Sequence, residues 1–141
     1  MPEVIRFKGL ELRFLHDKED TEGGLDMFEM TVEPNARMPV PHHHESWDET
    51  VYGLKGVMTF VVDGKTVQLR PGESLFIKRG VVHAFRNETQ GLASCLSVLT
   101  PGVLGPGYFR EMAALLSDGA PDTAKLKETM LRHGLVPAPP A

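Results

Sequence analysis

Apolar and polar residues alternate along most of the first hundred positions of the chain. Leu10, Leu12 and Phe14, for example, are separated by charged neighbours. Successive side chains of a strand point to opposite faces, so such a set lines one face of a sheet. Short segments of this kind, separated by Gly, Pro, Asn and Asp, continue over residues 4–100. This region therefore predicts an all-β antiparallel sandwich or barrel.

We expect eight or nine strands in this region. The strongest hairpin signal is Asp63-Gly64 between residues 57–62 and 65–69, because Asp-Gly supplies the positive φ values of a type I′ turn. Further strands are expected at 49–54, 74–77, 83–87 and 93–99.

The pattern changes to helical spacing after Thr100. One helix is expected from Tyr108 to Leu116, and a second begins after Asp122 or Thr123 and ends with Gly134 as C′ residue. Two short helices cannot bury a core alone. We therefore expect a barrel over residues 1–105, with helices and tail over residues 106–141 packed on it in the same domain. The first helix either covers a barrel mouth or packs outside, and we favour the outside.

Candidate chemistry is concentrated around a run of three histidines. His42 and His44 share a strand face, whereas His43 points away. Glu49 begins the next apolar strand, and His83 arrives from another strand about forty residues later. Imidazole and carboxylate are usual ligands of divalent first-row metals, and four such ligands leave about two octahedral positions open. These four residues predict a metal site.

Two acidic residues near Glu49 are alternative metal ligands, and two residues after His83 are candidates for the pocket wall. Glu45 and Asp48 are alternative carboxylate ligands, but Glu49 leads directly into the apolar strand. Phe85 and Asn87 lie two and four positions after His83, so they share its face if the strand continues. We expect Phe85 in a pocket wall, and Asn87 either orients a ligand or has no such role.

The remaining ionisable candidates are interpreted as structural. His16 lies in a charged turn and is expected to be solvated, and His133 is expected to favour the negative end of the second helix. Cys95 is the single cysteine, so no intrachain disulfide forms, and its apolar neighbours indicate a buried thiol.

Composition narrows the possible partners. The 141 residues carry a net charge of −4 without a run of Lys or Arg, which argues against nucleic acid and anionic membranes. No 18-residue apolar segment or secretory signal pattern is found, so we expect a cytoplasmic protein. The expected partner is a small molecule.

The spacing of these residues resembles the two motifs of the cupins over residues 36–100. The first motif reads His42-x-His44-x4-Glu49-x6-Gly56, and the second reads Gly72-x5-Lys78-x-Gly80-x2-His83-x3-Asn87. Two positions depart from the usual pattern, because Ala36 stands where the first motif begins with Gly and Lys78 replaces a Pro. Neither is a ligand position.

This resemblance implies a double-stranded β-helix, or jelly-roll barrel, with a short C-terminal helical extension. It also implies one divalent transition-metal ion per chain, Ni, Fe, Mn, Co or Zn, on His42, His44, Glu49 and His83. The C-terminal extension is similar to that of small one-domain cupins resembling bacterial quercetin dioxygenases. The implied function is a metal-dependent dioxygenase acting on a small aromatic or enolic compound, with Glu49 taking the substrate's proton.

Two alternatives remain beside that function. One is a metal-dependent isomerase or lyase without O2, and the other is a small-molecule or metal-binding cupin without turnover. A homodimer is expected in each case, because cupins commonly exchange an N-terminal strand, here around residues 4–14, to cover barrel edges.

Overall fold

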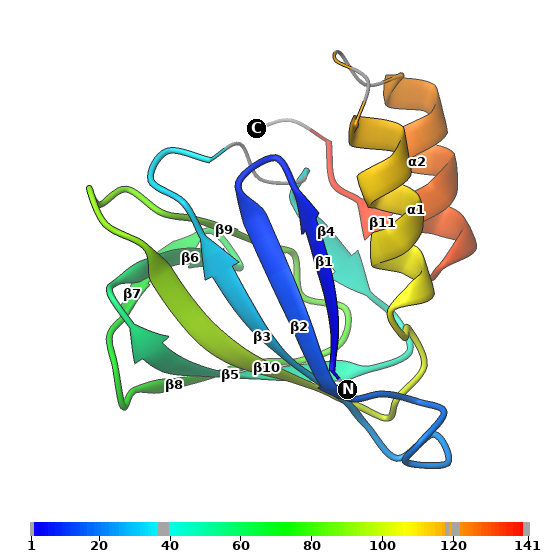
Figure 1. Cartoon of the computed structure of the whole chain (residues 1–141), viewed down its shortest axis with the longest axis horizontal. Helices are drawn as coiled ribbons and strands as arrows, with labels where there is room; N and C mark the ends of the chain where they lie inside the picture. The colour runs from blue at the N-terminus through cyan, green and yellow to red at the C-terminus, as the bar shows by residue number, and fades with distance from the viewer. Residues whose placement is uncertain (1, 37–39, 118, 120–121, 140–141) are drawn as a thin grey trace.

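Two antiparallel sheets face each other, and two helices pack beside one end of them (Figure 1). The structure is a computed structural model, and it describes residues 2–36, 40–117, 119 and 122–139. The strands are β1 (Glu3–Phe7), β2 (Leu10–His16), β3 (Asp26–Val32), β4 (His42–His44), β5 (Asp48–Lys55), β6 (Met58–Val62), β7 (Lys65–Leu69), β8 (Ser74–Ile77), β9 (His83–Arg86), β10 (Ala93–Thr100) and β11 (Leu135–Pro137). The helices are α1 (Gly107–Leu116) and α2 (Thr123–Arg132).

The strand order is that of a jelly-roll barrel, as the sequence predicts. One sheet runs β1-β2-β3-β10-β5-β8, and the other runs β11-β4-β9-β6-β7. The strand pairs in both sheets are antiparallel. The described residues form eleven strands rather than eight or nine. The short strand β11 is one of the additional strands, whereas β4 was expected from the strand positions of His42 and His44.

Local turn chemistry fixes the β6–β7 hairpin where it was expected. Asp63 and Gly64 have φ values of 52° and 77°, and Val62 pairs with Lys65 across the turn. These positive φ values are those of a type I′ connection, which matches the twist of the flanking strands.

The alternation of apolar residues places a hydrophobic core between the sheets. In β3, every second side chain is buried, beginning with Asp26 and ending with Val32. Asp26 is the polar exception, and its carboxylate accepts hydrogen bonds from the backbone N–H groups of Lys18 and Gly105. Burial raises the pKa of Asp26. This carboxylate therefore ties two loops to the end of β3.

The C-terminal segment begins and ends its second helix at the predicted residues. The Asp122 carboxylate accepts from the N–H groups of Ala124 and Lys125, and Gly134 has φ of 87° after the last turn. Tyr108 and Met112 of α1 are buried in the barrel's own hydrophobic core.

Neither described helix is long and apolar enough to cross a membrane.

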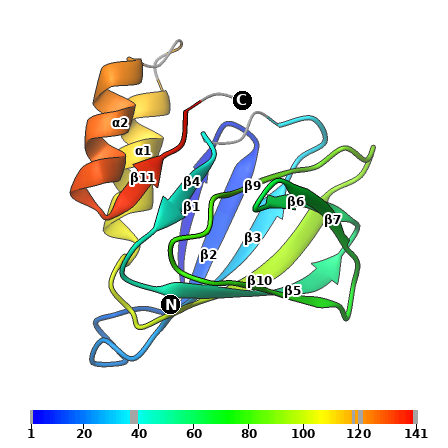
Figure 2. The same ribbon diagram turned by 180° about the vertical axis from the view of Figure 1, so that it is seen from behind.

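The residues after α2 form a strand that the sequence did not predict. Leu135–Pro137 pair with β4, so β11 forms one edge of the smaller sheet (Figure 2). Strand β1 forms one edge of the larger sheet, where it pairs with β2 of the same chain. A homodimer formed by exchange of this strand stays a prediction.

Candidate metal centre

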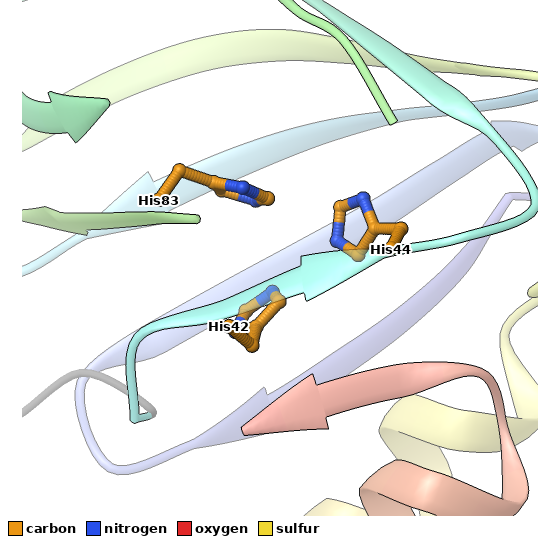
Figure 3. Close-up of side chains that lie close together, drawn as sticks. All are labelled: His42, His44 and His83. Carbon is orange, nitrogen blue, oxygen red and sulfur yellow. The ribbon is translucent and has the colours of Figure 1, made fainter. Parts of the chain in front are cut away.

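Three of the four predicted ligands meet inside the barrel. His42 and His44 project from β4, and His83 projects from the adjacent strand β9 (Figure 3). His42 and His83 are direct partners across the two strands. Each ring offers one nitrogen, and these atoms lie within 4.8 Å of one another. One ion can therefore be reached by all three side chains.

Two of the imidazoles are held in one orientation by backbone carbonyls. His42 Nδ1 lies 2.9 Å from the carbonyl oxygen of Val40, and His83 Nδ1 lies 3.0 Å from that of Val81. A carbonyl only accepts, so each Nδ1 carries the proton and donates it. Each Nε2 then has a free lone pair, which is the arrangement that metal-ligating histidines require.

The third imidazole is held by stacking. The ring of His44 lies 4.7 Å from that of Trp47 at an interplanar angle of 22°. Trp47 is fully buried, so it forms a fixed wall behind His44. His44 itself is only 5% exposed. The ring therefore has little freedom to turn away from the other two histidines.

Burial keeps His42 and His44 neutral by lowering their pKa values. Desolvation, reinforced by the neighbouring His83, lowers the pKa of His42 to about 4. The same two causes lower the pKa of His44 further. A histidine binds a metal ion through its neutral imidazole, which has a free lone pair on one ring nitrogen. At neutral pH, protons therefore do not compete for His42 and His44.

The carboxylate of Glu49 lies beside the histidines. Its Oε1 is 3.7 Å from His83 Nε2, and its Oε2 accepts a 2.5 Å hydrogen bond from the Ser97 hydroxyl. The alternative carboxylates are engaged elsewhere. Glu45 is exposed and approaches His43, whereas Asp48 accepts from Arg79, which lowers the pKa of Asp48. The geometry thus favours Glu49 among the three, although ligation by it stays a prediction.

The three histidines and Glu49 line one cavity. Its volume is about 60 Å³, and apart from these four groups the described lining is aromatic or aliphatic except for the Tyr108 hydroxyl. Phe85 is in the wall, as expected. Residues Tyr108, Phe109 and Met112 of α1 also line it. Helix α1 therefore covers the cavity, and the expectation that it packs outside is wrong.

Asn87 is not part of this wall. It is 1% exposed, and its Nδ2 donates to the carbonyls of Val32 and Gly91, while its Oδ1 accepts from the backbone and hydroxyl of Thr89. Every polar atom of the side chain is used in holding the loop after β9. Asn87 has a structural role, and a ligand-orienting role is excluded by these partners.

Other histidines behave in part as expected. His43 turns away from the centre and lies 3.4 Å from Glu45, and His16 is exposed beside Asp20. His133 is the C-cap residue of α2, and its Nε2 also lies 3.0 Å from the Glu111 carboxylate of α1.

Sequence reasoning missed Ser97 and the contribution of α1. The alternation of residues in β10 could have indicated that Ser97 points inward. Every second residue of this strand is buried, namely Ala93, Cys95, Ser97 and Leu99. Burial raises the pKa of the Cys95 thiol, which agrees with the predicted structural role.

Comparisons with known proteins agree on the family of this fold. A family model described as cupin domain, Cupin_2, matches residues 28–99. The chain is 37% identical over 79 residues to quercetin 2,3-dioxygenase of Bacillus subtilis, covering 56% of this chain and 23% of that one. It is 36% identical over 71 residues to an uncharacterized protein of Aquifex aeolicus, covering 50% and 58% respectively. The chain thus spans less than two thirds of either relative.

Two solved structures resemble it over most of its length. The polyketide cyclase RemF from Streptomyces resistomycificus is 32% identical with a TM-score of 0.59, covering 71% of this chain and 72% of that one. A predicted oxalate decarboxylase from Thermotoga maritima is 26% identical with a TM-score of 0.63, covering 72% and 92%.

Proposed function

Because the chain belongs to the cupin family, we propose that it is a metal-dependent enzyme, a quercetinase-like dioxygenase acting on a small aromatic or enolic compound. The observation that carries this proposal is the grouping of three imidazoles and one carboxylate in the wall of an otherwise apolar cavity. The similarity to quercetin 2,3-dioxygenase supports it over about half of the chain.

The donor groups fit a divalent transition metal. His42 and His83 present Nε2 lone pairs because their Nδ1 protons are bound to carbonyls, and Glu49 adds a negative charge. A bound ion would supply Lewis acidity, which lowers the pKa of a hydroxyl or enol that coordinates it. Among the protein groups, Glu49 is placed to accept the released proton through Oε1, the oxygen that Ser97 leaves free.

The cavity wall supports an apolar substrate. A carbohydrate or a polycarboxylate would bury hydroxyls or charges that need hydrogen-bond partners, and leaving them unpaired costs about 1–3 kcal/mol each or more. Among the described lining residues, only the three histidines, Glu49 and Tyr108 carry polar side-chain groups. A compact molecule with one enol or hydroxyl pair at one end and hydrocarbon elsewhere fits this wall best.

The size of the cavity favours small substrates. About 60 Å³ is far below the roughly 300–1,000 Å³ of sites for drug-sized ligands. A one-ring catechol or a β-diketone needs only a modest outward shift of the wall. A three-ring flavonol needs α1 to move, because Tyr108, Phe109 and Met112 of this helix line the cavity.

A second candidate keeps the metal and omits O2. Polarising an enolate or carbonyl also serves cyclisation, isomerisation or lyase chemistry, and the resemblance to a polyketide cyclase favours this candidate. Consumption of oxygen separates the two. A cupin that binds a small molecule without turnover would show neither oxygen uptake nor product.

The decisive experiment begins with elemental analysis of protein purified without a His tag. The His42→Ala/His44→Ala double variant should lose the metal and keep its β content by circular dichroism. His43→Ala is the matched control, because it lies on the same strand and points away, and it should retain the metal. Equal metal content in the double variant and the wild type would refute the assignment.

Activity is then tested with an oxygen electrode. Each candidate metal is supplied in turn, and catechols, β-diketones and flavonols are screened with product analysis in parallel. Oxygen uptake that depends on metal and on Glu49 supports the dioxygenase. Product without oxygen uptake supports the second candidate, and the absence of product with all three substrate groups argues against the proposed substrate class.

A further inference from the structure

Ser97 makes the direct contact between the middle of β10 and the carboxylate of Glu49. The strand β10 lies between β3 and β5 in the larger sheet, and Ser97 is 0% exposed. Glu49 pairs with Leu99, so Ser97 is its diagonal neighbour on the inward face. The Ser97 hydroxyl donates to Glu49 Oε2 at 2.5 Å.

The two oxygens of Glu49 therefore have different surroundings. Oε2 is occupied by a short hydrogen bond that points back into the sheet, whereas Oε1 faces the imidazole of His83 at 3.7 Å. The lining of the cavity includes no Lys or Arg among the described residues, so no cation reorients the carboxylate. The donor that sets its orientation is the hydroxyl of Ser97.

We propose that Ser97 is a positioning residue of the centre, which occupies Oε2 of Glu49 so that Oε1 alone is presented to the ion and the substrate. This inference rests on the metal-dependent function proposed above. Glu49 then acts as a one-oxygen ligand, and a second coordination position that a two-oxygen carboxylate would fill stays available to the substrate. A buried carboxylate without this hydroxyl would be free to rotate toward the cation with both oxygens.

A purely structural role for Ser97 predicts something different. In that case the hydroxyl serves only to satisfy a buried carboxylate, and its removal lowers stability without changing how Glu49 meets a metal. The distinguishing measurement is therefore the coordination mode of the carboxylate rather than the stability of the fold.

The test compares Ser97→Ala with Ser94→Ala. Ser94 lies on the same strand and faces outward, where its hydroxyl meets that of Thr31 at 3.0 Å. Co²⁺ affinity is measured by calorimetry on each metal-free protein. The separation of the carboxylate stretching bands, which differs between one-oxygen and two-oxygen ligation, is measured by infrared difference spectroscopy on Co²⁺ addition.

Ser97→Ala is expected to change Co²⁺ affinity by about 10–100-fold, as for other partners of metal ligands, and to shift the bands toward two-oxygen ligation. Ser97→Thr, which keeps the hydroxyl, should restore both readouts to near wild type, and Ser94→Ala should leave both unchanged. If Ser97→Ala does not fold, Ser97→Cys keeps the volume with a weaker donor and should lie between Ala and Ser.

Two negative results are distinguishable. If the wild type binds Co²⁺ and Ser97→Ala, or Ser97→Cys in its place, matches it in affinity and carboxylate bands, the positioning role is overturned and the metal centre stands. If the wild type binds neither Co²⁺ nor another candidate metal, the proposed function is overturned and this inference with it.

Discussion

Phe109 is the residue whose removal tests how the cavity is closed. It lies on α1 in the cavity wall, and its ring centroid is 5.8 Å from that of Phe14, 5.5 Å from Phe28 and 5.0 Å from Tyr108. Phe109→Ala removes this ring from a packed aromatic cluster. The change should enlarge the cavity from about 60 Å³ toward the ~150 Å³ at which engineered apolar cavities admit benzene.

The loss of stability follows from the same contacts. Fully buried Phe→Ala changes cost about 3–5 kcal/mol, and aromatic pairs contribute about 0.5–1.5 kcal/mol each beyond their buried area. Phe109 is only partly buried. We therefore expect a loss of about 2–3 kcal/mol in the free energy of unfolding, measured by urea denaturation.

Guest binding provides the second readout and Phe76 the control. Phe76 on β8 is 59% exposed, so Phe76→Ala should change stability by less than about 0.5 kcal/mol. Benzene at ten times its Kd should stabilise Phe109→Ala by about 1.4 kcal/mol and leave Phe76→Ala and the wild type nearly unchanged. Equal stabilisation of all three proteins, or no loss of stability in Phe109→Ala, would refute the conclusion that α1 closes the cavity.

Three further predictions concern acid, a loop and a helix. The pKa of His42 is about 4 in the folded state and 6.5 in the unfolded state, so the unfolded state binds more protons as the pH falls below 6.5. The metal-free protein should therefore lose about 3 kcal/mol of unfolding free energy between pH 7 and pH 4 through this group, measured by urea denaturation. His44 should add to this loss, because its pKa is lowered as well. A pH-independent stability would contradict this. Asp26→Ala leaves the buried N–H of Gly105 and the partly buried N–H of Lys18 without acceptors and should cost about 2–4 kcal/mol in thermal or urea unfolding, with Asp26→Asn milder. Asp122→Ala removes the cap of α2 and should cost about 1 kcal/mol, most of which Asp122→Ser should restore.

The features that the sequence predicted correctly are those with local causes. The Asp63-Gly64 turn, the Asp122 cap and the Gly134 helix end are fixed by residues within a few positions of each other. The alternation that places His42 and His44 on one face is also local, because it depends only on the strand. Their meeting with His83 was inferred from motif spacing, since no local pattern determines which strands pair.

Asn87 shows that strand alternation alone can assign a side chain to the wrong surroundings. The alternation that groups His83, Phe85 and Asn87 holds only while the strand continues, and β9 ends at Arg86. Beyond that point the backbone turns, and the Asn87 side chain reaches the carbonyls of Val32 and Gly91 instead of the cavity. The position of a strand end depends on the neighbouring loop, which the alternation does not encode.

The position of α1 was beyond sequence reasoning for a related cause. Tyr108 and Met112 are four positions apart, so they share one helical face, and both are buried. Which part of the barrel receives them depends on contacts with residues about one hundred positions away, such as Phe7 and Leu10, which also line the cavity. Helical periodicity specifies the buried face of a helix but not its partner.

The C-terminal extension belongs to the site through two separate connections. Helix α1 covers the cavity, and β11 pairs with β4, where Leu135 is opposite His44 and Pro137 is opposite His42. On its other side, β4 meets β9 through the His42–His83 pair, so a strand of three residues obtains most of its registered partners from the C-terminus. A Cβ at Gly134, just before β11, would lie 3.2 Å from the Trp47 ring that stacks on His44. Residues 134–137 therefore help to fix the two histidines of β4, although they contribute no ligand themselves.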